Sequence, residues 1–154
     1  MFIKKLARAS AVAIIVLVGA LSFGVPAQAA PSTFLAQAIH SSGRVAAAVT
    51  GKMWFSALSV GFNDVTLTIV ANECAYVVFS GTARGHHYEK YVPDNASYCA
   101  GSTGRTINLG NHVLATTQQG GFADAEISVV DDSHGIVGWA LCGRYDTSCW
   151  RGQS

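Results

Sequence analysis

The stretch from residue 65 to residue 85 constrains the fold more than any other part of the chain. Its sequence, VTLTIVANECAYVVFSGTARG, shows a period of two and no helical period. In residues 65–71, aliphatic side chains fall on one face of an extended chain and threonines mostly on the other, which predicts a half-buried strand. Asn72-Glu73 suits a turn. Residues 74–80 then carry bulk on both faces, so a second strand should lie in the interior of a sheet.

Other segments repeat this alternation at short intervals. Gly51, Gly61-Phe62-Asn63-Asp64 and Gly110-Asn111 separate them, and we expect turns there, with hairpins around Gly51 and Gly110-Asn111. Eight or nine short strands with almost no helical period predict an all-β fold, an antiparallel β-sandwich of Greek-key or immunoglobulin-like type. A small closed β-barrel is the alternative. Beyond 65–85, the expected strands are 45–49, 53–58, 86–92, 106–109, 112–117, 123–129 and 136–142.

One segment could depart from the all-β pattern. Pro31-Ser32-Thr33 can cap a short N-terminal helix in which Phe34, Leu35, Ala38 and Ile39 share a face. The alternative for the same residues is a frayed, extended arm.

The first 29 residues have the three parts of a secretory signal peptide. Lys4, Lys5 and Arg8 form a cationic start, residues 11–21 form an apolar run, and Ala27-Gln28-Ala29 is a small-x-small cleavage site. The apolar run is shorter than the roughly 20 residues that span a bilayer. We therefore expect cleavage after Ala29, secretion, and no membrane association afterwards.

Removing 29 of the 154 residues leaves 125, a size at which one domain with one core is the default. We expect residues 30–154 to form a single, disulfide-stabilised, monomeric β domain. Three of the ten lysines and arginines lie in the leader, so seven basic residues remain against nine acidic ones. A net charge of −2 gives no reason to expect a nucleic-acid partner.

The chain has four cysteines, and an exported chain can keep them oxidised. We expect Cys74 to pair with Cys99 and Cys142 with Cys149, because each pair lies close in the chain across a turn-rich segment. The other two pairings stay open at this stage. The cysteines lack the C-x-x-C spacing of zinc fingers and ribbons, so no metal or cofactor is expected from them.

The C-terminal segment is the strongest candidate for a binding site. A Cys142–Cys149 disulfide would close a small loop that presents Arg144 and Tyr145. Arginine, tyrosine and tryptophan are the residue types enriched at binding hot spots, and a loop tied in advance loses less entropy on docking. The alternative is that the disulfide only fixes a loose C-terminus. The candidate binding residues are Arg144, Tyr145, Asp146, Trp150 and Arg151.

A second group of residues suggests an enzyme. His86, His87 and Glu89 lie on one expected edge strand, and a histidine, a carboxylate and either Arg84 or Arg105 could together serve a small secreted ribonuclease. The alternative is a solvated edge strand, where such side chains discourage pairing with other sheets.

Metal binding would need more than these residues supply. His87 and Glu89 are only two ligands, and a third, such as His112 or His134, would have to come from elsewhere in the fold. Asp131-Asp132-Ser133-His134-Gly135 offers oxygen atoms for calcium, but it lacks the carboxylate spacing of an EF-hand loop. We interpret it as a solvated turn.

These observations favour a binding function over catalysis. We expect a small secreted interaction protein, such as an inhibitor, a toxin-like domain or a ligand-binding domain. Its partner would be an extracellular protein or a small ligand. The alternatives are the small hydrolase and a structural or cell-surface-associated protein.

Overall fold

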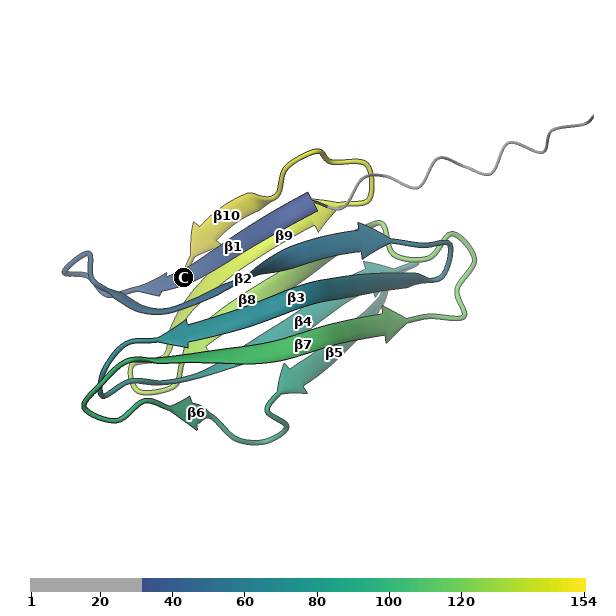
Figure 1. The fold of residues 1–154 in the computed structure, drawn as a ribbon. Helices are drawn as coiled ribbons and strands as arrows, with labels where there is room; N and C mark the ends of the chain where they lie inside the picture. The colour runs from purple at the N-terminus through teal and green to yellow at the C-terminus, as the bar shows by residue number, and fades with distance from the viewer. Residues whose placement is uncertain (1–31) are drawn as a thin grey trace, which may run out of the picture.

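The computed structural model of the protein describes residues 32–154 (Figure 1). The expected signal peptide lies outside the described residues, so its cleavage stays a prediction. The described part contains strands and no helix, and none of it forms a helix long and apolar enough to cross a membrane. The strands are β1 (Ser32–Ile39), β2 (Val45–Phe55), β3 (Ser59–Ile69), β4 (Cys74–Ala83), β5 (His86–Val92), β6 (Tyr98–Cys99), β7 (Arg105–Ala115), β8 (Asp124–Asp131), β9 (Ile136–Gly143) and β10 (Trp150–Gln153).

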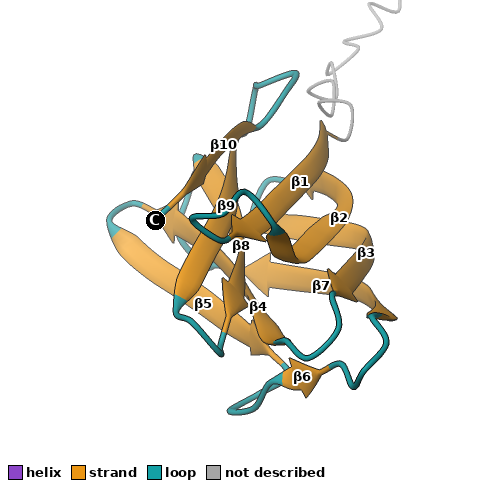
Figure 2. Cartoon of the chain, turned by 90° about the vertical axis from the view of Figure 1, so that its left-hand side faces the viewer, coloured by secondary structure: helices purple, strands orange, loops and turns teal. Residues whose placement is uncertain are grey.

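The strands form two antiparallel sheets that pack face to face. One sheet has the order β1-β2-β3-β7, and the other has the order β10-β9-β8-β4-β5 with β6 paired to β4. Figure 2 shows the two layers from the side. The predicted β-sandwich is therefore confirmed, and the closed barrel is wrong. β4 lies inside its sheet and β5 lies at the edge, as their side-chain patterns predicted.

The core lies between the sheets and is built around large aromatic side chains. Phe62 of β3 and Phe79 of β4 are fully buried, and their ring centroids are 4.6 Å apart across the sandwich. Phe122 is also fully buried. Burying each of these rings contributes about 2 to 3 kcal/mol relative to leaving it in water.

The N-terminal segment is a strand, so the expected short helix is wrong. β1 pairs with β2 along its whole length, with Ser32 opposite Met53 and Ile39 opposite Val45. Phe34, with Ala36 and Ala38, alternates into the core. A period of two therefore fits the segment better than the helical face, because the small alanines let β1 lie close to the facing sheet.

Two glycines that suggested turns instead lie inside long strands. β2 continues through Gly51 and β7 continues through Gly110, with irregular register at both places. At Gly51 an added Cβ would lie 2.6 Å from the Phe34 ring and 2.9 Å from the Asn63 carbonyl oxygen. Gly110 has a φ of +77°, which suits a bulge. The expected turn at 61–64 is likewise part of β3.

Both expected disulfides are present. The Cys74–Cys99 bond joins the start of β4 to β6, and the Cys142–Cys149 bond joins β9 to the loop before β10. Each bond thus tethers an irregular segment to a regular strand.

Candidate functional site

Part of the loop closed by the Cys142–Cys149 disulfide, residues 145–148, is exposed to solvent. Tyr145 is 87% exposed, and Trp150, just beyond the loop, is 72% exposed. Asp146 holds the loop in shape, because its carboxylate accepts a hydrogen bond from the Gly143 amide at 2.8 Å. The carbonyl oxygen of Asp146 also accepts one from the Ser32 hydroxyl at 3.0 Å.

Arg144 faces inward, although the sequence suggested that the loop would present it. Its Nε donates a hydrogen bond to the Phe122 carbonyl oxygen at 2.8 Å, and its guanidinium carbon lies 5.7 Å from the centroid of the Phe55 ring. Its backbone amide donates to the carbonyl of Ala123. Arg144 therefore fastens the loop to the body of the sandwich.

The exposed aromatic residues continue onto the outer face of the sheet. Trp150 of β10 lies opposite Leu141 of β9, and Gly152 lies opposite Trp139, whose ring covers it. Residues directly opposite on paired strands share a face, so Trp139, Leu141 and Trp150 belong to one surface. We call this set, together with Tyr145 and Arg151, the C-terminal surface; Arg151 lies opposite Ala140 and so points to the other face of β10, toward the groove beside β1.

A shallow groove of about 260 Å³ borders the C-terminal surface. It lies between β1 and the β9–β10 pair, and the Gln153 side-chain amide donates across it to the carbonyl of Ile39. β1 and β10 are both edge strands of their sheets. The residues that line the groove are Leu35, Gln37, Ile39, Trp139, Arg151, Gly152 and Gln153.

The second candidate group lies on the exposed edge strand β5. Nε2 of His87 is 2.7 Å from a carboxylate oxygen of Glu89, and the Tyr91 hydroxyl donates to the other carboxylate oxygen at 3.0 Å. The hydrogen bond from His87, followed by that from Tyr91, holds the pKa of Glu89 below its ordinary value. The same contact with Glu89 raises the pKa of Tyr91. His86 is exposed beside them.

The fold does not bring Arg105 to this group. His86 lies opposite Ala83, the last residue of β4, whereas Arg105 lies opposite Ile69, the last residue of β3. The chain turns from Ile69 into the first residue of β4, so Arg105 and His86 lie at opposite ends of the sandwich. Arg105 therefore does not join these histidines, whereas Arg84 lies in the turn between β4 and β5, two residues before His86.

His112, one of the proposed third metal ligands, is half-buried and packs against the core. Its Nε2 donates to the Leu109 carbonyl oxygen at 3.1 Å, and its ring centroid lies 4.6 Å from that of Phe79. Burial, with a smaller contribution from Lys90, lowers the pKa of His112. Its ring is therefore engaged with the margin of the core and does not face the other candidate ligands.

One cluster of potential metal ligands exists among residues 32–154. It consists of His40, Glu73, Asp131 and His134, whose ligand atoms all lie within 4.8 Å of one another. His40 follows β1, Glu73 lies in the β3–β4 turn, Asp131 ends β8 and His134 lies in the β8–β9 turn. Three chain reversals at one end of the sandwich thus contribute to it. We call it the His/carboxylate cluster.

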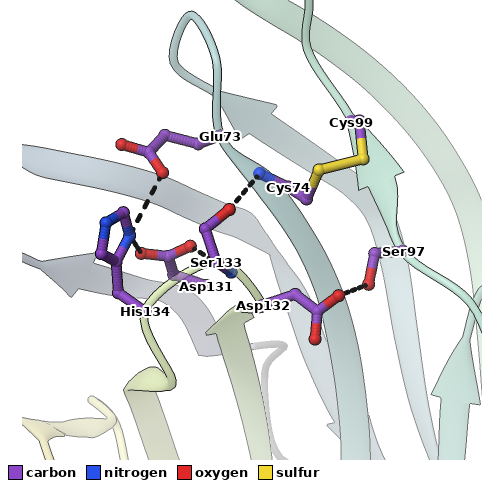
Figure 3. The surroundings of a disulfide bond; sticks show 8 residues. All are labelled: Glu73, Cys74, Ser97, Cys99, Asp131, Asp132, Ser133 and His134. Atoms are coloured by element: carbon purple, nitrogen blue, oxygen red, sulfur yellow. Dashed lines mark hydrogen bonds and ion pairs between the residues drawn. A yellow bond between two sulfur atoms is a disulfide. The ribbon is translucent and has the colours of Figure 1, made fainter.

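The cluster is buried except at His134. The side chains of Asp131, Glu73 and His40 are 0%, 5% and 13% exposed, whereas that of His134 is 51% exposed. Nδ1 of His134 lies 2.9 Å from Asp131 Oδ2 and 3.4 Å from Glu73 Oε2. Figure 3 shows both carboxylates directed toward the His134 ring. The rings of His40 and His134 meet edge to face, with centroids 4.6 Å apart.

Arg44 closes one side of the cluster. Its Nη2 lies 2.6 Å from Glu73 Oε1 and 3.1 Å from His40 Nε2. Burial acts to raise the pKa of Glu73, but the hydrogen bond from Arg44, with contacts to His40 and His134, outweighs it and holds the pKa below its ordinary value. Glu73 is therefore an ionised carboxylate in a nearly closed site.

Backbone and disulfide contacts fix the position of the cluster (Figure 3). The Ser133 amide donates to Asp131 Oδ1 at 3.0 Å, and the Cys74 amide donates to the Ser133 hydroxyl at 3.3 Å. The Asp132 amide donates to the Cys74 carbonyl at 2.9 Å. The Cys74–Cys99 bond then ties this turn to the β6 segment.

A separate cavity of about 470 Å³ lies beside the same disulfide. Tyr76 and Tyr91 form part of its wall, with ring centroids 6.2 Å apart. Asp132, the neighbour of Asp131, also lines it. The Asp132 carboxylate accepts a hydrogen bond from the Ser97 hydroxyl at 2.7 Å, so it is already engaged by the protein.

The sequence interpretation did not identify the His/carboxylate cluster. It assigned residues 131–135 to a solvated turn and Glu73 to a turn, gave His40 no role, and named His134 only as a possible third metal ligand beside His87 and Glu89. A signal is present, because each of the four residues stands at or just beyond the end of a strand. That signal becomes useful only when the sheet order shows that these ends meet.

Comparison with protein-family models, with curated proteins and with solved structures found no significant match to this chain. The interpretation of both sites therefore depends on their own geometry.

Proposed function

We propose that this chain is a small secreted interaction protein that recognises a partner protein through the C-terminal surface. The observation that supports it is the exposure of Trp150 (72%) and Tyr145 (87%) on and beside a loop closed by a disulfide. Large aromatic side chains bury much apolar area when a partner covers them. Tryptophan and tyrosine are therefore enriched among the few residues that dominate binding energy at protein interfaces. The disulfide and Arg144 hold the loop in place, so docking orders little additional chain.

The surface also indicates what the partner should offer. Trp139, Leu141 and Trp150 form an apolar surface on paired strands, and the groove beside β1 accepts an apolar side chain. Arg151 is exposed at the border of this groove. A partner protein with an apolar anchor next to a carboxylate would fit this arrangement, because arginine recognises carboxylates through two parallel hydrogen bonds.

The experiment compares proteins retained by the immobilised chain and by a Trp150→Ala, Tyr145→Ala variant. The source is medium in which the producing cells have grown, and retained proteins are quantified by mass spectrometry. Truncating a hot-spot residue weakens binding by about 2 kcal/mol or more, which is about 30-fold in Kd. We therefore expect the double variant to bind the partner of the wild type at least about 30-fold more weakly.

A matched control removes a different exposed aromatic residue. Tyr91 is 44% exposed and lies on β5, at the edge of the sheet opposite β10. Tyr91→Ala should retain the partner as the wild type does. Thermal unfolding verifies that all variants fold. If the double variant retains the same proteins in the same amounts as the wild type, the proposal is wrong.

A further inference from the structure

We propose that the His/carboxylate cluster is a binding site for a divalent transition-metal ion, and that Zn²⁺ is the ion it fits best. This site is separate from the C-terminal surface, and it does not depend on the function proposed above. The proposed site gives a common role to four residues that no pattern in the sequence relates to one another.

The first argument is that acceptor atoms converge in the cluster. Arginine has donors only, so Arg44 Nη2 donates to Glu73 Oε1, while His40 Nε2 lies 3.1 Å from Arg44 Nη2 and 3.2 Å from Glu73 Oε1. When the ring proton of His40 is on Nδ1 and Arg44 turns aside, Nε2 presents its lone pair to the cluster, 3.9 Å from Oδ2 of Asp131. Lone pairs that face one another at such distances are stabilised by a cation between them.

The second argument is an unsatisfied buried carboxylate oxygen. Oε2 of Glu73 has no hydrogen-bond partner among the described residues, although the side chain is 95% buried. Nδ1 of His134 lies 3.4 Å from it, but that nitrogen is closer to Asp131, at 2.9 Å. Burying an ionised oxygen without a partner is costly, so this atom points to a ligand that the protein itself does not supply.

The third argument is geometric. Four ligands at about 2.1 Å around a tetrahedral Zn²⁺ lie about 3.4 Å from one another. Nδ1 of His134 lies 2.9 Å from Asp131 Oδ2 and 3.4 Å from Glu73 Oε2, Nε2 of His40 lies 3.9 Å from Asp131 Oδ2, and all four ligand atoms lie within 4.8 Å of one another. Small side-chain rotations would therefore suffice to enclose the ion.

The ligand set selects the kind of metal. Two imidazole nitrogens and two carboxylate oxygens suit Zn²⁺ and related transition metals. Calcium instead prefers six to eight oxygen ligands. The exposed ring of His134 gives the ion a route from solvent, whereas Asp131 and Glu73 form the closed side. His134 binds through Nδ1 when its proton is on Nε2.

Four protein ligands indicate a structural site. Catalytic zinc sites keep one position for water, whereas structural sites are closed by four side chains. Here the ligands come from the β1–β2, β3–β4 and β8–β9 connections, so a bound ion would cross-link both sheets at one end of the sandwich. The ion should therefore stabilise the fold.

The test is a titration of the chelator-treated, oxidised protein with Zn²⁺ and, separately, with Ca²⁺. Isothermal titration calorimetry should show one Zn²⁺ per chain and no comparable Ca²⁺ binding. His134→Ala removes a half-exposed ligand without opening the core, and we expect it to weaken Zn²⁺ binding at least tenfold. His86→Ala, an exposed histidine on β5, is the matched control and should bind as the wild type does.

Two further readouts separate this site from nonspecific binding. At one fixed concentration, Zn²⁺ should raise the melting temperature of the wild type and of His86→Ala more than that of His134→Ala. In NMR spectra, Zn²⁺ should shift the His40 Nε2 and His134 Nδ1 resonances and leave those of His112 unchanged. Absence of Zn²⁺ binding, equal binding by His134→Ala, loss of binding in His86→Ala, or preference for Ca²⁺ would each overturn the proposal.

Discussion

Arg144 donates a hydrogen bond from Nε to the carbonyl oxygen of Phe122 at 2.8 Å, and this contact turns the only arginine of the disulfide loop into the protein. The guanidinium also lies over the Phe55 ring. Within the loop, Tyr145 is therefore left as the large exposed side chain, and the cation of the C-terminal surface is Arg151. Arg144 should act on stability and Arg151 on recognition.

Replacing Arg144 by alanine should lower the free energy of unfolding by about 2 kcal/mol, because a hydrogen bond from a charged group and the packing on Phe55 are both lost. Urea unfolding of the variant and the wild type measures this difference in the free energy of unfolding. Arg151→Ala, at an exposed position, should stay within about 0.5 kcal/mol of the wild type. An Arg144→Ala protein as stable as the wild type would show that the inward contact contributes nothing.

Gly138 of β9 should not tolerate a side chain. An added Cβ would overlap the carbonyl of Gln37 on β1, where the two sheets approach closely. We expect Gly138→Ala to destabilise the protein by about 3 kcal/mol, since backbone must move to relieve the overlap. Gly101→Ala is the control, because a Cβ there meets no atom within 4 Å. Equal melting temperatures for the two variants would contradict this account of the interface.

His112 should make stability depend on pH. Burial lowers its pKa, so between that lowered pKa and the ordinary value only the unfolded chain takes up the proton. The free energy of unfolding should therefore fall as the pH drops from above the ordinary histidine value of 6.5 toward the lowered pKa of His112. His112→Gln has no titrating group and can still donate to Leu109, so it should lose less stability over this range. Chemical unfolding at several pH values provides the comparison, and parallel curves for both proteins would count against it.

The two disulfides should contribute unequally. The Cys74–Cys99 bond closes a separation of 25 residues and the Cys142–Cys149 bond one of 7. Chain-entropy arithmetic assigns about 3.5 and about 2.5 kcal/mol to loops of these lengths. Replacing the first pair by alanine should therefore lower the melting temperature more than replacing the second. The reverse order would indicate that the loop-length argument does not govern this fold.

Local patterns were sufficient to predict the β-sandwich and both disulfides. The alternation in residues 65–71 and the two-sided bulk of 74–80 identify β3 and β4, because side chains in strands alternate between faces. The charged edge strand β5 could be recognised for the same reason. These features depend on neighbouring residues, so they are visible before the fold is known.

Other features depend on contacts between distant residues. The Phe34 ring lies against Gly51 and leaves no room for a side chain there. In the sequence alone, a glycine needed for such a close contact cannot be distinguished from a glycine in a turn. The helix expected at the N-terminus failed because its apolar residues also satisfy a period of two. The inward direction of Arg144 depends on Phe122, 22 residues earlier in the chain.

The His/carboxylate cluster shows this limit most clearly. Its residues span positions 40 to 134 and come from three separate connections, so no sequence spacing relates them. Each residue alone resembles an ordinary turn residue. Only the order of the strands brings them within 4.8 Å of one another.

The most direct measurement is a crystal structure of the protein grown with Zn²⁺, with diffraction data collected on both sides of the zinc absorption edge. We predict a single strong anomalous peak in the described domain, in contact with His40 Nε2, His134 Nδ1 and the carboxylates of Glu73 and Asp131. A map with no zinc peak among these four side chains would contradict the account.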